Sequence, residues 1–394
     1  MDKEIKKIGA VIVSDLNHNN YGSALQAYAT IKVVESKGYQ ITLIKYKKER
    51  SIIDWLKIVP GLMMSGGLEL VKKRLKMRWQ KKVHPEYVAH LQERFHATNN
   101  FKEKEFVHLF REYKGYSALC EGSKEFDAVF VGSDQVWRPY GFYSNYWNLN
   151  FADDNVPKFS YSSSYGVSQI PFIQKSGTRK YLERLDMISV REKKAKEIVE
   201  NLSRKKATVV ADPTMLLSRE EWLAFAEKSK MELPSEPYIF CYFLGPRRDI
   251  REQAMNFAKR KRMKILCMPH MEEYRKQDLC FGDIINWEAN AYDFVNIINH
   301  AAYVCTDSFH GTVFSIILHK KFFTFYRAFG QSTNSRIDSL LSTFNLAERI
   351  CYDSIQDEDK TEIDYLRVDA KMIEYRSQSM SFLEKALALS KTSK

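Results

Sequence analysis

A histidine in the last third of the chain, His310, has the neighbours that proton transfer beside an anionic ligand would need. The residues up to Cys305 are apolar, as in a buried parallel strand, and an almost wholly apolar run follows from Thr312. Between them, Asp307 and Ser308 are residue types that begin helices. The pattern predicts a strand, a tight polar turn and a buried helix, with His310 near the start of that helix.

Such a position favours ligand binding. Open α/β sheets bind ligands beyond the carboxyl ends of their strands, and free N–H groups at a helix N-terminus attract anions. An unperturbed histidine titrates near neutral pH, so it can donate or accept a proton. We therefore predict chemistry on a phosphorylated substrate. The alternative is that Asp307 and Ser308 only cap the helix and that His310 is a polar residue with a structural role.

The composition limits the class of protein. The chain has 394 residues, of which 44% are hydrophobic, and this is enough for two domains with large cores. Lys and Arg number 61 against 49 Asp and Glu, a formal net charge of +12. That balance favours a phosphorylated substrate, an acidic polysaccharide or an anionic membrane, without choosing among them. Nucleic acid is not expected, because the basic residues are spread out and no recognition motif appears.

The six cysteines are scattered without a Cys-x-x-Cys pair, so they indicate reduced core residues rather than zinc ligands or disulfides. No Asp-x-Asp or clustered His/Cys motif calls for a metal. The N-terminus lacks the features of a signal peptide, and no apolar run approaches the ~20 residues of a membrane span. These features predict a cytoplasmic protein.

The N-terminal elements predict a parallel sheet. Residues 8–13 form a strand pattern, 23–37 a helix pattern and 39–46 a second strand pattern, which together make a βαβ unit. Its loop is not Gly-x-Gly-x-x-Gly, which argues against a standard dinucleotide site. Four later apolar segments each end in polar residues, as the rim of a cleft would. They lie at 126–131, 158–163, 187–190 and 208–211.

A second set of strand patterns begins at 238–244 and continues at 264–268, 303–305 and 321–325. We therefore expect an α/β fold with two Rossmann-like domains facing across a cleft, as in the GT-B glycosyltransferases. The expected units are an N-terminal acceptor-side domain at 1–214, a C-terminal donor-side domain at 215–365, and a terminal helix at 366–394.

The segment at about 51–110 has a different character, because it is rich in Lys, Arg and aromatic residues. We interpret it as a helical insertion in the N-terminal domain. Basic and aromatic amphipathic character is typical of a helix on a membrane surface. It is equally typical of a solvated helical arm that packs on its own domain.

Six short segments, in this order, resemble those of the polysaccharide pyruvyl transferase family. They are Asn-Tyr-Gly-Ser-Ala-Leu-Gln at 20–26, Val-Gly-Ser-Asp-Gln-Val-Trp at 131–137, Ser-Tyr at 160–161 with Tyr-Gly at 165–166, Ile-Ser-Val-Arg-Glu at 188–192, Asp-Pro-Thr at 212–214 and Thr-Asp-Ser-Phe-His-Gly at 306–311. Each segment is a weak signal alone, whereas six in the family's order are a strong one.

The resemblance implies an enzyme that takes phosphoenolpyruvate as donor and attaches its pyruvyl group to sugar hydroxyls, usually as a ketal, in cell-surface polysaccharide synthesis. It implies phosphoenolpyruvate as a co-substrate, with no further cofactor. The acceptor is then expected to be a lipid-linked sugar at the cytoplasmic face of the membrane, which suits a basic, membrane-peripheral protein.

The resemblance also suggests roles for individual residues. His310 would be the acid/base group or would donate hydrogen bonds to the leaving phosphate. Arg191 would bind phosphate or carboxylate, and Asp134 would either activate a sugar hydroxyl or fix a loop by an Asx-turn. Arg191 has an alternative role in an ion pair with an acid of the following helix.

Other residues would line the two sides of the cleft. The acceptor side would be lined by the segment at 17–22, with Asn20, Tyr21 and Gly22, and by the pair Ser133 and Gln135. The donor would be bound by Asp307, Ser308, Gly311, Thr312 and Arg336. The N–H groups of Gly311 and Thr312 would surround the phosphate, and Gly311 would allow it to approach the backbone closely.

Two other functions fit the same fold. A GT-B glycosyltransferase that uses a nucleotide sugar would usually need an acidic residue for the ribose, where this chain offers His, Ser and Gly. A non-catalytic carbohydrate-binding protein would not need His310 and Arg191 together.

Overall fold

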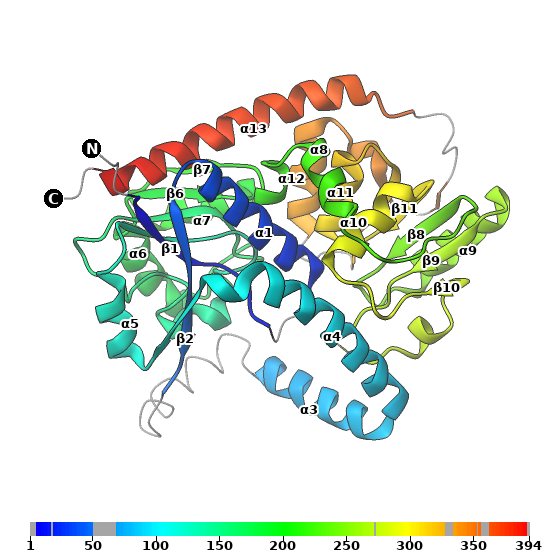
Figure 1. Ribbon diagram of the computed structural model, residues 1–394, viewed down its shortest axis with the longest axis horizontal. Helices are drawn as coiled ribbons and strands as arrows, with labels where there is room; N and C mark the ends of the chain where they lie inside the picture. The colour runs from blue at the N-terminus through cyan, green and yellow to red at the C-terminus, as the bar shows by residue number, and fades with distance from the viewer. Residues whose placement is uncertain are drawn as a thin grey trace.

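The computed structural model describes residues 5–16, 19–49, 68–271, 273–327, 334–352, 354–355 and 362–391, which form two parallel sheets flanked by helices (Figure 1). The first sheet has the strand order β3-β2-β1-β4-β5-β6-β7, and all of its strand pairs are parallel. Its strands are β1 (Lys7–Val11), β2 (Gln40–Lys47), β3 (Phe110–Lys114), β4 (Ala128–Val131), β5 (Lys158–Ser163), β6 (Met187–Val190) and β7 (Ala207–Val209).

The second sheet repeats this plan with the order β10-β9-β8-β11-β12-β13, again entirely parallel. Its strands are β8 (Tyr238–Tyr242), β9 (Lys264–Cys267), β10 (Ile284–Ile285), β11 (Tyr303–Thr306), β12 (Lys321–Phe325) and β13 (Ile350–Cys351). In both sheets the strand order reverses beside the first strand, between β1 and β4 and between β8 and β11. Ligands of doubly wound sheets bind at that reversal, beyond the carboxyl ends of the strands.

The helices lie on the faces of the sheets and between them. The N-terminal half contains α1 (Tyr21–Ser36), α3 (Leu68–Val83), α4 (Pro85–Phe106), α5 (Tyr116–Ser123), α6 (Lys175–Glu183) and α7 (Lys193–Leu202). The C-terminal half contains α8 (Arg219–Ala226), α9 (Arg248–Lys261), α10 (Ala291–His300), α11 (Phe309–Ile317), α12 (Ser335–Phe344) and α13 (Tyr365–Ala388).

The sequence pattern explains the central elements. Strands β4, β8 and β11 are buried along their whole length, as their largely apolar sequences require. Helix α1 begins at Asn20, whose side chain accepts a hydrogen bond from the Ser23 N–H, and α11 is buried at every residue. One hydrophobic core runs from beneath β1 through α1 and α10 to α11, so the two halves pack directly on one another. The expected fold of two Rossmann-like domains is confirmed.

Three strands were not predicted. β3 follows directly on the basic insertion, and β10 and β13 contain two residues each. Two-residue segments carry no periodicity, and β3 is mostly polar; the pairing of these three segments with β2, β9 and β12 defines them as strands.

The predicted insertion forms the antiparallel pair α3 and α4; its first part, up to residue 67, lies outside the described residues (Figure 1). Helix α4 packs on its own domain at the start of α1, where the Thr98 hydroxyl donates to Asn19, and it also reaches the other domain. The Arg94 side chain on α4 donates to the Trp287 and Asn286 carbonyls, and the Tyr87 hydroxyl donates to the Met271 carbonyl, all beyond the second sheet's strands. The pair therefore links the two halves.

Helix α13 crosses in the opposite direction, from the second half back to the first (Figure 1). Its Arg376 donates to the carbonyls of Met215 and Leu217, and the Ser379 hydroxyl accepts a hydrogen bond from the Ala211 N–H. The terminal helix thus closes over the segment that joins the two sheets.

Candidate functional site

Three strands of the first sheet deliver charged side chains to one point. Asp134 follows β4, Arg191 follows β6 and Asp212 follows β7. The Arg191 Nη1 atom lies 2.9 Å from Asp212 Oδ2, and its Nη2 atom lies 3.5 Å from Asp134 Oδ1. Arg191 is buried between these two carboxylates. It therefore does not form the alternative ion pair with an acid of the following helix at the protein surface. The parallel sheet explains this convergence, because the carboxyl ends of its strands share one edge.

Asp134 is held by the loop that contains it. Its backbone is left-handed, with φ of 74°, and its carboxylate accepts the Gln135 N–H and the Ser23 hydroxyl, the latter at 2.6 Å. Burial would raise the pKa of Asp134, but Arg191, His310 and Ser23 together hold it well below the usual range. A carboxylate with so low a pKa is a weak base. The geometry therefore favours the loop-fixing role of Asp134 over activation of a sugar hydroxyl.

Asp212 is a functional candidate that sequence reasoning did not assign to the site. Its Oδ2 atom accepts from Arg191 and from the Ser133 hydroxyl at 2.9 Å, and its Oδ1 atom accepts from the Thr214 hydroxyl and N–H. Burial would raise the pKa of Asp212, but His310, Arg191 and Thr214 hold it well below the usual range. Its place at the end of a strand was the available signal.

His310 comes to this cluster from the second sheet. It is 7% exposed, and its Nε2 atom lies 3.6 Å from Asp212 Oδ2, which is longer than a hydrogen bond. Nε2 has no hydrogen-bond partner among the described residues. On its other side the ring packs against the start of α1, where a Cβ added to Gly22 would lie 1.9 Å from Nδ1. A histidine of one domain is thus fixed against a glycine and an aspartate of the other.

The first turn of α11 differs from the predicted phosphate cradle. Ser308 caps the helix by accepting the Gly311 N–H, and the Thr312 N–H bonds to the Ser308 carbonyl. The donors without an acceptor in the described part of the chain are therefore the N–H groups of Phe309 and His310. Gly311 serves packing, because a Cβ there would lie 2.5 Å from Thr306 Oγ1.

Asp307 also has a structural role in place of the predicted ligand contact. Its two carboxylate oxygens accept the N–H groups of Leu244 and Gly245, at 2.6 and 2.7 Å. This carboxylate therefore joins the ends of β8 and β11 at the reversal of the second sheet.

Arg336, at the start of α12, supplies a second buried guanidinium beside Arg191. It is 6% exposed, and it has no hydrogen bond or ion pair with any described residue. Its Cζ atom lies 5.9 Å from the centre of the Phe309 ring, and the Arg191 Cζ atom lies 4.5 Å from the same centre. Burial, with repulsion from Arg191 and Arg327, lowers the pKa of Arg336 to about 9. The nearby carboxylates of Glu192 and Asp134 offset only part of this effect. A buried guanidinium without a hydrogen bond or ion pair points to an anionic ligand.

Glu192 lies next to Arg191 and was not predicted as a site residue. Its Oε1 atom accepts the Ser164 hydroxyl at 2.8 Å, and its buried Oε2 atom has no hydrogen-bond partner among the described residues. Burial raises the pKa of Glu192, and Arg191 and Arg336 offset only part of this effect. Such a group can hold a proton at a higher pH than an ordinary glutamate.

The predicted acceptor-side residues are dispersed. Asn20 caps α1, whereas Tyr21 is buried, stacks on Phe294 with ring centres 5.0 Å apart, and donates to the Ala289 carbonyl. Tyr21 therefore belongs to the contact between the domains. Ser133 and Gln135 adjoin Asp134, and Gln135 is partly exposed. Residues 17 and 18 of the predicted loop lie outside the described residues.

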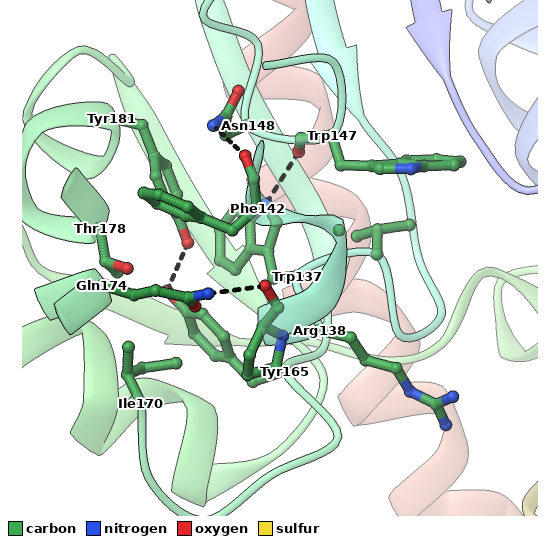
Figure 2. A pocket seen from close by; sticks show the side chains of 13 residues that line it. Trp137, Arg138, Phe142, Trp147, Asn148, Tyr165, Ile170, Gln174, Thr178 and Tyr181 are labelled. Carbon is green, nitrogen blue, oxygen red and sulfur yellow. Dashed lines mark hydrogen bonds between the residues drawn. The ribbon is translucent and has the colours of Figure 1, made fainter. Parts of the chain in front are cut away.

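The residues that come directly after Gln135 help to enclose a small cavity lined by aromatic side chains (Figure 2). Trp137, Phe142, Tyr165 and Tyr181 line it, and the two tyrosine hydroxyls are hydrogen-bonded, while Arg138 points away from it. Its volume is about 10 Å³, which has room for about one water molecule. It is therefore part of the core that supports the 131–137 segment rather than a substrate site.

Within the described ranges, no three His, Cys, Asp or Glu side chains gather as ligands for a metal ion. None of the described helices is both long enough and apolar enough to cross a membrane.

Comparison with known proteins gives the family. A sequence model of the family "Polysaccharide pyruvyl transferase" matches residues 20–328. No curated protein sequence gives a significant match. The chain therefore belongs to the polysaccharide pyruvyl transferase family, a family of transferases, as its six segments predicted.

A solved structure shares the fold. UDP-GlcNAc 2-epimerase from Methanocaldococcus jannaschii, solved in complex with UDP-GlcNAc and UDP, has 11% identity and a TM-score of 0.50, covering 97% of this chain and 99% of its own. The UDP-GlcNAc 2-epimerase from Neisseria meningitidis, bound to UDP-GlcNAc, has 10% identity and a TM-score of 0.49, covering 95% of this chain and 93% of its own.

Proposed function

We propose that this protein transfers the pyruvyl group of phosphoenolpyruvate to sugar hydroxyls, forming a pyruvate ketal in the synthesis of a cell-surface polysaccharide. The observation that carries the proposal is the buried, unpaired guanidinium of Arg336 beside Arg191, His310 and the first turn of α11. Family membership supports pyruvyl transfer in general, and this cluster supports a small donor with more than one anionic group.

The charges in the cluster favour such a donor. The carboxylates of Asp134 and Asp212 both form ion pairs with Arg191. Arg336 is attracted by Asp134 and Glu192 only at longer range, and it has no ion pair with a described side chain. Phosphoenolpyruvate carries a phosphate and a carboxylate. A guanidinium can bind either group through two hydrogen bonds, and the N–H groups of Phe309 and His310 can donate to the same anion.

The reaction requires controlled movement of protons. The methylene carbon of phosphoenolpyruvate gains a proton, two sugar oxygens form bonds to the adjacent carbon, and the bond from that carbon to the phosphate oxygen breaks. The two hydroxyl groups lose two protons: one is balanced by the new methyl hydrogen and the other leaves with the phosphate. A group that donates and accepts protons near neutral pH is therefore needed at the reacting carbon or at the leaving oxygen.

His310 is suited to that task by its position. Its Nε2 atom is buried and lacks a hydrogen-bond partner in the described structure, while Asp212 lies close enough to stabilise an imidazolium ring. Gly22 holds the ring from the other side, which fixes its orientation. Glu192 is a second proton-holding group in the same cluster.

The sugar acceptor would approach from the N-terminal domain, next to Gln135 and the start of α1. We expect it to be carried on a lipid at the cytoplasmic face of the membrane, and we expect no cofactor besides the phosphoenolpyruvate co-substrate.

A thermal-shift titration tests the proposed donor. Phosphoenolpyruvate should raise the melting temperature, because a ligand at ~100 times its Kd stabilises the native state by about 2.7 kcal/mol. UDP-GlcNAc and other nucleotide sugars serve as comparison ligands. A shift with a nucleotide sugar and none with phosphoenolpyruvate would contradict the proposal and favour a glycosyltransferase.

A further inference from the structure

Helix α3 carries an exposed apolar stripe. Every fourth residue from Val71 is large and apolar, and the exposed fractions are 51% for Val71, 58% for Leu75, 61% for Trp79 and 48% for Val83. Residues four apart follow one another along the same face of a helix. Isolated exposed apolar residues are ordinary on a protein surface, whereas four in line along one helix face require an explanation.

The stripe faces away from the rest of the molecule. Helix α3 attaches to the protein through Gln80, which is buried and exchanges two hydrogen bonds with the backbone of Tyr274. A position one residue after Trp79 lies about 100° around the helix from it. In Figure 1, α3 forms the lower edge of the molecule, with α4 between it and α1. No contact of the described fold therefore accounts for the stripe.

Basic residues flank the stripe on both sides. Within Leu68–Val83 there are seven Lys or Arg residues and one acidic residue, Glu69. Arg74, Arg78 and Lys82 each precede a residue of the stripe, and all three are exposed. The next helix, α4, mixes both signs of charge, so the basic character is confined to α3.

We propose that α3 is a membrane-docking helix that lies in the plane of an anionic lipid surface, with its apolar stripe inserted among the acyl chains. A helix that lies in a membrane interface needs two kinds of side chain. Apolar residues such as Trp or Leu enter the boundary between headgroups and acyl chains, and Lys and Arg contact the anionic headgroups. A second copy of this chain is a poor occupant, because pairing two α3 helices through their stripes would bring two strongly basic surfaces together.

The arm is also connected to the candidate site. Helix α4 continues from α3 to the start of α1, where the Thr98 hydroxyl donates to Asn19 Oδ1 at 2.9 Å and the Arg94 guanidinium lies 5.1 Å from the Tyr21 ring centre. Docking through α3 would bring the acceptor side of the site near the lipid surface. This last step rests on the proposed function, whereas the membrane contact itself does not.

Co-sedimentation with vesicles tests the docking helix without measuring activity. The full chain should sediment with vesicles of phosphatidylcholine and phosphatidylglycerol, should bind vesicles of phosphatidylcholine alone far more weakly, and should be released by salt. Arg74→Glu/Arg78→Glu/Lys82→Glu should reduce binding roughly a hundredfold or more. The control Lys180→Glu/Lys206→Glu/Lys259→Glu changes the net charge equally at exposed sites elsewhere and should bind nearly as well as the wild type.

The apolar stripe has its own test. Leu75→Gln/Trp79→Gln should reduce vesicle binding at least tenfold. The control Leu366→Gln/Ile373→Gln, which removes two exposed apolar side chains from α13, should bind as the wild type does. Equal binding by the α3 and control variants would overturn the proposal.

Tryptophan fluorescence locates the contact. Vesicles should shift the emission of the wild type to shorter wavelengths. In a chain that already carries Trp55→Phe, Trp79→Phe should still sediment but should lose that shift, since Trp137, Trp147, Trp222 and Trp287 lie outside α3. A shift retained in Trp79→Phe would contradict insertion at α3. A concentration-dependent dimer that forms without vesicles and is abolished by Leu75→Gln/Trp79→Gln would also contradict the proposal. The stripe would then be an interface between copies of the chain.

Discussion

Gly22 and His310 are 288 positions apart in the sequence, and a methyl group on the first would overlap the ring of the second. A Cβ added to Gly22 would lie 1.9 Å from the His310 Nδ1 atom and 2.4 Å from Cγ. The first turn of α1 and the first turn of α11 therefore meet at this histidine. Through this contact the N-terminal domain determines where a side chain of the C-terminal domain can lie.

We predict that Gly22→Ala will impair turnover far more than folding. The added methyl group must displace the His310 ring from its present position beside Asp212, and a displacement of about 1 Å can lower kcat about a hundredfold. Overpacking should cost about 1–3 kcal/mol of stability. Phosphate release and thermal melting measure the two effects. Gly141→Ala is the control, because its added Cβ would meet Trp147 at an ordinary 3.5 Å.

We predict that His310→Gln will fold normally and lower phosphate release by roughly 10²–10⁴-fold. Glutamine keeps a polar side chain of similar length but cannot transfer a proton near neutral pH. The control is His319→Gln, since His319 pairs with Asp369 outside the candidate site. Turnover in His310→Gln close to that of the wild type would exclude proton transfer by this residue.

Arg336 and Arg251 offer a matched pair of buried arginines. Arg251 is paired with Asp278 at 2.8 Å, whereas Arg336 has no partner among the described residues. Arg336→Met should therefore leave the melting temperature unchanged or higher and abolish the shift caused by phosphoenolpyruvate. Arg251→Met should lower stability by roughly 3–5 kcal/mol, because it leaves a buried carboxylate unpaired, and should keep the shift. The opposite outcome would show that Arg336 is structural.

Asp212→Asn should destabilise the protein at neutral pH by about 3 kcal/mol, because it removes a buried charge that faces Arg191 and His310. The pKa of Asp212 is lower in the folded state than in the unfolded state. Its contribution to stability is therefore complete above the ordinary carboxyl pKa of about 4 and is lost as the pH falls toward the folded value. Unfolding curves at several pH values should show the wild type and Asp212→Asn converging only in strong acid. A constant difference would contradict this assignment.

Glu192→Gln should have the opposite dependence. The pKa of Glu192 is raised on folding, so keeping this side chain ionised costs stability at neutral pH. The variant should melt at a higher temperature than the wild type near pH 7, and the difference should shrink as the pH falls toward about 4. Glu197→Gln, at an exposed position paired with Lys194, should melt as the wild type does at every pH.

Much of the architecture could be predicted because its signals are local. The strand, loop and helix at 8–37 and the polar turn before α11 are defined by hydrophobic periodicity and by capping residues such as Asn20 and Ser308. The family followed from six short segments in order, and it is confirmed over residues 20–328. The two-residue strands β10 and β13 could not be predicted, since only their neighbours define them.

The site was less accessible than the fold because its decisive contacts join distant segments. The sequence showed that His310 would lie at a helix N-terminus, but its contacts with Asp212 and Gly22 depend on how two domains pack. It also could not show which N–H groups of α11 remain free, since the Ser308 cap occupies the one on Gly311. Arg336 had only a weak signal, because an unpaired buried arginine is visible only in three dimensions.

The most direct measurement uses phosphoenolpyruvate labelled with carbon-13 at its central carbon, incubated with the enzyme and an extract of lipid-linked saccharides. We predict that the label will move from the enol carbon to a ketal carbon in the saccharide fraction, with one phosphate released for each ketal, and that His310→Gln will give neither. Phosphate release without transfer of the label, or labelled product at the wild-type rate in His310→Gln, would contradict pyruvyl transfer at this site.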